Sequence, residues 1–355
     1  MAKKENNSST TNTLSDFVNS VINLLHDIGS PVETIEFDPS KTIADLSGLG
    51  ICLNSEASKF ALAFKPPVVA ENASSCESFL NRLTQLTLIC KGIPLNQGKC
   101  FRQEILEACK KVLKASICLG NSFLDKPISF EGENQKFIAG SLALDKEFLA
   151  STGILWNECE GLKNLPKSNK EAAYKRFLDV ISLVDDAIYE IQELLDETQN
   201  RQEIDTIASA RDSEELCDDF DLLDIDSVQL SLAQGAVVKK SLSLMKLIKL
   251  LLVKISKRTI TESDINAEGI PDLIDLLVDE AKAVSNSVDD LGASLWDRNN
   301  HEELSDAISN LASCTKSLLK LATSISCDSH HSWFESCTKQ VASLESDLLV
   351  GATGW

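Results

Sequence analysis

One glycine-containing loop has a spacing close to that of a phosphate-binding loop. Residues 92–100 read Gly-Ile-Pro-Leu-Asn-Gln-Gly-Lys-Cys, whereas a P-loop reads G-x-x-x-x-G-K-S/T, with the final hydroxyl on magnesium. The stretch between Gly92 and Gly98 is one residue too long, and Cys100 stands where Ser or Thr is needed. No strand pattern precedes the loop. The sequence therefore predicts a turn between helices and no nucleotide site.

The second group of chemically capable residues is a Cys/His cluster, Cys327, His330, His331 and Cys337. Two thiolates and two imidazoles could hold a zinc ion tetrahedrally. The spacing, however, does not match finger or ribbon patterns, and Cys337 falls on an apolar helical seam. We expect a polar turn between two helices, with no metal ion and no other cofactor.

Adjacent carboxylates are the third group, at Asp185-Asp186 and Asp289-Asp290. Neighbouring residues on a helix point about 100° apart, so neither pair can share a proton as an acid–base couple does. None of the four histidines has a sequence context that suggests a nucleophile, its base and an orienting acid. We therefore expect a protein that is not an enzyme and that has no small-molecule ligand.

The charge of the chain narrows the class of partner. A formal net charge of −20 opposes binding to nucleic acid, because such affinity comes from clustered Lys and Arg. The same charge opposes an anionic membrane surface, and the most apolar stretch, 242–255, contains three lysines and is shorter than the ~20 residues of a membrane span. We expect protein partners, with no direct contact to nucleic acid or membrane.

The cysteines and the first residues indicate the compartment. Eleven cysteines are scattered without a CxxC pair and resemble buried thiols, which suits a reducing environment. Residues 1–13 are polar, without the apolar core of a secretory signal or the arginines of a presequence. We expect a cytoplasmic and nuclear protein.

The elements that must position these residues follow one repeated pattern. Apolar residues recur at alternating spacings of three and four, which is the seam of helices packed nearly antiparallel. No period-two strand pattern competes with it, and aromatic residues make up only 5% of the chain. The sequence predicts an all-α fold with helices over 14–28, 43–64, 76–90, 105–119, 137–155, 177–195, 228–255, 271–295, 304–325 and 334–348.

A strongly acidic stretch divides the chain. It contains Asp212, Glu214, Glu215, Asp218, Asp219, Asp221, Asp224 and Asp226. Like charges at this density favour an extended, solvated linker, although the stretch could also dock a basic partner. We predict a disordered tail at 1–13, an N-terminal bundle at 14–204, the linker at 205–226 and a four-helix bundle at 227–350. The helix over 177–195 could pack in either bundle.

Several short stretches, in order along the chain, resemble one known family. They are Asn96-Gln97-Gly98, Trp156-Asn157-Glu158-Cys159, Pro166-Lys167-Ser168-Asn169-Lys170-Glu171-Ala172-Ala173, Ser287-Val288-Asp289-Asp290-Leu291-Gly292-Ala293-Ser294-Leu295-Trp296 and Ser332-Trp333. They are similar to the cyclin-D-binding protein family, also described as cyclin-D-interacting or maternal Id-like proteins, over roughly residues 40–350. The segment around 127–134 and the first helix depart from the family pattern.

The resemblance implies a function that composition does not. It implies a regulator, nuclear and cytoplasmic, that binds D-type cyclins and helix-loop-helix transcription factors and restrains cell-cycle progression or transcription. It also implies two antiparallel helix bundles similar to those of vinculin and talin, so a vinculin-like adaptor for cytoskeletal partners is the alternative. Fold alone cannot distinguish the two functions.

The protein-binding residues are predicted from the pattern of one helix. Asp289 and Asp290 flank the seam residues Val288 and Leu291 without belonging to the seam, and Trp296 follows them near the end of the helix. An exposed Trp beside charges is typical of contact hot spots. The alternative is that Trp296 only closes the end of the bundle.

Overall fold

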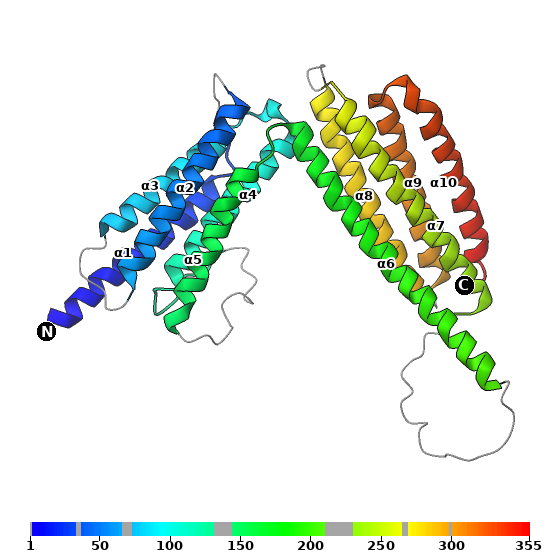
Figure 1. Ribbon diagram of the computed structural model, residues 1–355, viewed down its shortest axis with the longest axis horizontal. Helices are drawn as coiled ribbons and strands as arrows, with labels where there is room; N and C mark the ends of the chain where they lie inside the picture. Colours follow the sequence, from blue (N-terminus) through cyan, green and yellow to red (C-terminus); the bar gives the residue numbers. More distant parts are fainter. Residues whose placement is uncertain are drawn as a thin grey trace, which may run out of the picture. The chain divides into compact units, whose positions relative to one another are not determined.

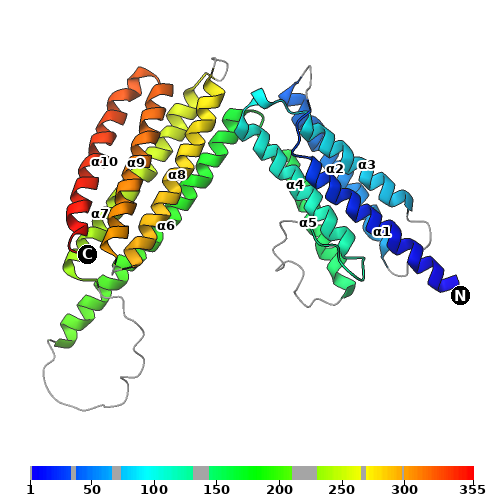
Figure 2. The ribbon, with the colours of Figure 1, turned by 180° about the vertical axis from the view of Figure 1, so that it is seen from behind.

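The computed structural model describes residues 2–32, 37–65, 73–130, 144–209, 230–264, 269–297 and 300–355. Every regular element within these ranges is a helix, and none is a strand (Figures 1 and 2). The all-α prediction is therefore confirmed. The chain divides into two compact units, Met1–Ala172 and Ala173–Trp355, which are described separately.

The first unit is built from five helices in the part of the chain that is described. They are α1 (Ala2–Asp27), α2 (Pro39–Phe64), α3 (Ala73–Lys91), α4 (Lys99–Asn121) and α5 (Leu144–Gly161), with short 3-10 turns η1 (Leu95–Gln97) and η3 (Leu162–Asn164). Helix α1 packs on α3 and α4, α2 packs on α3 and α5, and α4 packs on α5. The buried faces are the ones that the three-four spacing predicts, since Leu46, Leu53 and Phe60 of α2 are fully buried.

Phenylalanines fill the centre of the first unit. The Phe60 ring lies 4.8 Å from Phe17 and 5.4 Å from Phe79 between ring centroids, which joins α2 to α1 and α3. Phe123 lies 6.0 Å from Phe60 and 5.5 Å from Phe148, which extends the cluster to α5. Tilted and edge-on aromatic pairs at these separations add to the energy of area burial. The helices of this unit are thereby fixed against one another around a single core.

The second unit contains most of α6 (Asn169–Ser209), followed by α7 (Leu232–Lys254), α8 (Ile270–Trp296), α9 (His301–Ile325) and α10 (His331–Ala352). A π-helical turn, η4 (Ile255–Ile260), continues α7, and a 3-10 turn, η5 (Asp328–His330), precedes α10. Helix α9 packs on α8 and α10, and α7 packs on α8 and α10. Both views show α6 running beside α8 (Figures 1 and 2).

The contacts place the helix over 177–195 in the second unit. Its seam residues Val184, Ile188 and Ile191 are buried, and Lys246 of α7 donates a hydrogen bond to the side-chain oxygen of Gln192 at 3.1 Å. The second unit therefore has five described helices, because it includes the helix whose bundle the sequence left open. The division by contacts falls at 172/173, whereas the predicted linker covers 205–226. An amphipathic stripe specifies that a face is buried but not which bundle buries it.

Helices extend into both segments that the sequence predicts to be irregular, the tail at 1–13 and the linker at 205–226. Helix α1 begins at Ala2, and no Pro or Gly interrupts residues 2–27. The helix therefore includes residues 2–13, which the sequence assigns to a tail. Helix α6 continues to Ser209, into the predicted linker, and residues 210–229 lie outside the described part. No described helix combines the length and the hydropathy needed to cross a bilayer.

Candidate protein-binding surfaces

Helix α8 presents the three predicted binding residues outside its buried seam. Val288 and Leu291 have no exposed surface, whereas Asp289 and Asp290 are exposed and the Trp296 side chain is 48% exposed. Helix α8 ends at Trp296, and the N–H of the next residue donates to the carbonyl of Ala293, which closes the last turn. The indole is therefore held at the helix end with about half of its surface available to a partner.

Helix α6 completes a shallow pocket around this Trp. The pocket has a volume of about 220 Å³ and is lined by Trp296 with Glu190, Glu193, Leu194 and Glu197 of α6. Leu194 is buried and forms part of the core, while the three glutamates are exposed. We call Asp289, Asp290, Trp296 and these three glutamates the α6–α8 surface. The residue pattern of the sixth helix signals its acidic outer face, but only the fold brings that face to Trp296.

The negative charges of neighbouring carboxylates on the α6–α8 surface repel one another. Partial burial raises the pKa of Asp289 above its ordinary value, and the negative charges of Asp290 and Glu190 raise this pKa further. The charged side chains that line the pocket are all glutamates. A cationic group from a partner would relieve this repulsion, and it could also lie over the indole face in a cation–π contact.

The other adjacent carboxylate pair does not belong to this surface. Asp185 forms an ion pair with Lys249 of α7, so its charge is already partly neutralised. Asp186 is exposed on the same helix. Both residues lie in the second unit, on the helix whose bundle the sequence left open.

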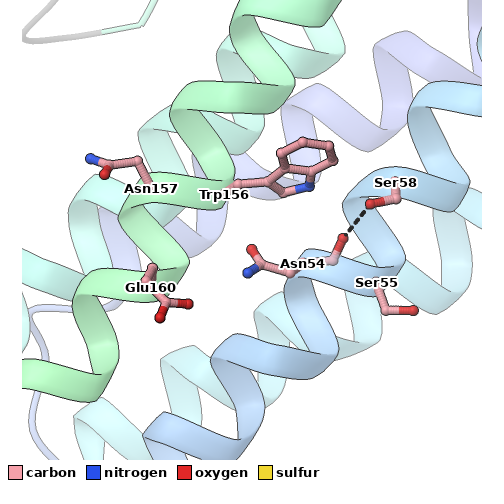
Figure 3. Close-up of a pocket in the computed structure, with 6 residues that line it drawn as sticks. All are labelled: Asn54, Ser55, Ser58, Trp156, Asn157 and Glu160. Carbon is pink, nitrogen blue, oxygen red and sulfur yellow. Dashed lines mark hydrogen bonds between the residues drawn. The ribbon is translucent and has the colours of Figure 1, made fainter.

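A second hollow lies in the first unit, between α2 and α5 (Figure 3). Its volume is about 600 Å³, and its lining residues are Asn54, Ser55, Ser58, Trp156, Asn157 and Glu160. Figure 3 shows the Trp156 indole extending toward α2, and 46% of this side chain is exposed. The side-chain oxygen of Asn54 is buried without a hydrogen-bond partner. In the sequence, Trp156 is singled out only by the family resemblance, which does not predict that it lines a surface.

The loop at 92–100 is an inter-helix turn, as predicted. Its residues form η1 and the start of α4. The backbone N–H of Phe101, in the first turn of α4, donates to the side-chain oxygen of Asn169 at 2.9 Å. The amide group of Asn169 therefore occupies a position where a P-loop would bind phosphate.

Comparisons with known proteins agree with the resemblance in the sequence. Residues 45–197 match the family model described as Grap2 and cyclin-D-interacting, N-terminal, and residues 212–320 match its C-terminal counterpart. The junction of these matches, between 197 and 212, falls nearer to the predicted acidic linker than to the division by contacts.

Two curated relatives cover most of the chain. A Cyclin-D1-binding protein 1 homolog from Xenopus laevis is 28% identical over 276 residues, which is 76% of this chain and 76% of the relative. A protein of the same name from Danio rerio is 26% identical over 294 residues, covering 80% of this chain and 78% of the relative. Together with the two matched models, these similarities show that the chain belongs to the Grap2 and cyclin-D-interacting protein family.

Proposed function

We propose that the protein is a non-enzymatic regulator that binds D-type cyclins and helix-loop-helix transcription factors in the cytoplasm and nucleus. By holding these partners it would restrain cell-cycle progression or transcription. Family membership supports the cyclin as partner, since both relatives carry cyclin-D1 binding in their names. Binding of helix-loop-helix factors extends this proposal on the basis of the resemblance in the sequence.

The observation that carries the proposal is the half-exposed Trp296 surrounded by carboxylates. Large aromatic side chains with a polar rim dominate the energy of many protein interfaces. The surrounding negative charge selects a partner with basic side chains and speeds its association. The basic region of a helix-loop-helix factor is a continuous cationic helix, and its charge complements the α6–α8 surface. A basic helical face of a cyclin would be recognised in the same way.

The test is charge reversal on the α6–α8 surface. The variant Asp289→Lys/Asp290→Lys changes the charge by four units, and we expect at least tenfold weaker binding to a D-type cyclin or a helix-loop-helix factor. The loss should arise mainly from slower association, and it should shrink as salt screens the surface. Binding kinetics at two salt concentrations measure both effects, and circular dichroism checks that the fold is retained.

A matched control carries the same charge change elsewhere. Glu77 of α3 and Glu335 of α10 are exposed, and α10 packs on α7 and α9, away from the pocket that Trp296 lines. We expect Glu77→Lys/Glu335→Lys to bind nearly as the unchanged protein does. Asp185→Lys is unsuitable as a control, because it would also break the ion pair with Lys249.

Three outcomes would contradict parts of the proposal. Equal losses in both charge variants would mean that net charge, and not the α6–α8 surface, controls binding. Loss of binding in Trp156→Ala together with full binding in Trp296→Ala would move the site to the α2–α5 hollow. If the unchanged protein bound neither partner, the adaptor function for cytoskeletal proteins would be favoured.

A further inference from the structure

Three side chains with metal-binding groups converge at one end of the second unit. Glu262 follows the π-helical turn η4, and Cys327 and His330 lie in the connection between α9 and α10. One ligand atom from each of the three lies within 4.8 Å of the other two. The Glu262 Oε2 and His330 Nε2 atoms are 3.2 Å apart. This group shares no residue with the α6–α8 surface or the α2–α5 hollow.

Hydrogen bonds hold the two segments in place. The Thr259 and Ser326 hydroxyl groups are hydrogen-bonded at 2.6 Å, which ties η4 to the end of α9. The N–H of His330 donates to the carbonyl of Cys327 at 3.0 Å, so the turn η5 brings both side chains to one side. A π-helical turn changes the direction of the residues that follow it, and such turns are frequent at functional sites.

Neighbouring side chains orient two of the three candidate ligands. The Arg258 guanidinium donates to Glu262 Oε1 at 2.7 Å, which leaves Oε2 facing His330. The Ser329 hydroxyl lies 3.1 Å from Cys327 Sγ and could donate to a thiolate. Partners of this kind are the usual second layer around a metal ion, where they fix the direction of each ligand.

We propose that Glu262 Oε2, Cys327 Sγ and His330 Nε2 bind one zinc ion, with water in the fourth position. A thiolate, an imidazole and a carboxylate form a ligand set typical of zinc, which accepts all three in tetrahedral geometry. Ligand atoms at about 2.0–2.3 Å from such an ion are separated by roughly 3.3–3.7 Å. Small rotations of the two exposed side chains, Glu262 and Cys327, and of the half-buried His330 would bring the three atoms from their present separations to this geometry.

The proposed ligands differ from the Cys/His cluster in the sequence, because His331 and Cys337 are not among them and Glu262 is. Cys337 is buried on α10, and His331 Nε2 lies 3.1 Å from the carbonyl oxygen of Ser326. Glu262, which is distant in sequence, replaces them. The spacing argument against zinc covered only candidate ligands between residues 327 and 337, whereas the folded site combines two segments that are distant in sequence.

Binding to the full-length protein can be tested with Zn²⁺ and with Co²⁺ as a spectroscopic probe. We expect one metal ion per chain, a visible Co²⁺ spectrum of tetrahedral type and a thiolate charge-transfer band. Cys327→Ser should abolish the charge-transfer band, and His330→Gln should weaken binding at least tenfold. The matched controls are Cys314→Ser and His301→Gln on α9, which should leave binding unchanged. Circular dichroism confirms that each variant is folded.

A second readout does not depend on the variants. Cys52 and Cys327 are both exposed, so both should react with N-ethylmaleimide in metal-free protein. Zinc should slow the reaction of Cys327 by at least tenfold and leave that of Cys52 unchanged, as mass spectrometry of the labelled peptides would show. Equal rates with and without zinc, absence of the charge-transfer band, or unchanged affinity in Cys327→Ser and His330→Gln would each overturn the proposal.

Discussion

The side-chain oxygen of Asn169 accepts a hydrogen bond from the backbone N–H of Phe101 at 2.9 Å, so a residue distant in sequence caps the start of α4. The residue at the N-cap position is Gly98, which has no side chain to do this. Asn169 is itself buried. The contact joins the helix that directly follows one stretch of the family resemblance, Asn96-Gln97-Gly98, to the stretch that contains Asn169.

Gly98→Ala should be strongly destabilising. Gly98 has φ +93° and ψ 146°, a region that is almost restricted to glycine. A Cβ atom there would lie 2.1 Å from Cγ of Asn169. Strain and clash together should lower the free energy of unfolding by at least about 2 kcal/mol, measured by urea denaturation.

Asn169→Ala removes the cap and should cost about 1 kcal/mol. Because it also removes the atoms that a Cβ at Gly98 would meet, the double variant should lose less than the sum of the two single variants. Additive losses would show that Asn169 is not the cause of the clash.

Two glycines of α2 should respond oppositely to the same substitution. A Cβ on Gly48 meets nothing within 4 Å, whereas a Cβ on Gly50 would lie 2.7 Å from the backbone oxygen of Cys159 in α5. Replacing Gly by Ala in a helix gains up to about 1 kcal/mol of intrinsic propensity. Gly48→Ala should therefore raise the melting temperature, and Gly50→Ala should lower it because α2 and α5 must move apart. Stabilisation by both substitutions would contradict the close approach of these helices.

The sequence predicts the helices well because the buried face of a helix requires apolar residues at alternating spacings of three and four. Phe177, Val184 and Ile191 belong to this pattern, and all three are buried on α6. The same pattern cannot specify which bundle covers them, since any apolar surface satisfies it. The placement of α6 in the second unit is fixed by contacts between distant segments, such as the Gln192–Lys246 hydrogen bond.

At the candidate surfaces too, the local sequence predicts which residues are exposed but not which distant residues they approach. The pattern of α8 alone places Asp289 and Trp296 outside the seam, and the structure has both there. The approach of Glu190 to Asp289 and that of Glu262 to His330 depend on helix packing. Neither approach leaves a mark in the local sequence, so neither could be predicted from it.

The cysteines should separate into reactive and unreactive groups. Burial raises the pKa of Cys76 and of Cys159 to about 12, so almost no thiolate exists at neutral pH. Among the described cysteines of the metal-free folded protein, alkylation should reach Cys52 and Cys327 first and leave Cys76 and Cys159 unmodified until urea unfolds the chain. Mass spectrometry of the labelled peptides over time would show the order. Early labelling of Cys159 would contradict its burial against α2.

The last prediction concerns the pH dependence of stability at Asp289. Its folded-state pKa lies above the ordinary value of 3.8 because of partial burial and the charges of Asp290 and Glu190. Between the ordinary and the raised pKa, the folded protein binds more protons than the unfolded chain. The contribution of this group to the free energy of unfolding therefore falls as pH rises through that window, and the destabilisation is complete above it.

Asp289→Asn removes the charge and should raise the free energy of unfolding at pH 7 by up to about 0.5 kcal/mol, a small gain because solvent screens an exposed carboxylate. The gain should shrink as pH falls through the ordinary pKa of 3.8, because Asp289 becomes increasingly protonated in both states. Urea denaturation at pH 7 and pH 3.5 measures the difference, with Asp306→Asn on the exposed face of α9 as the matched control. If Asp289→Asn gave the same change at both pH values, the cause would be packing of the amide and not relief of the repulsion among these carboxylates.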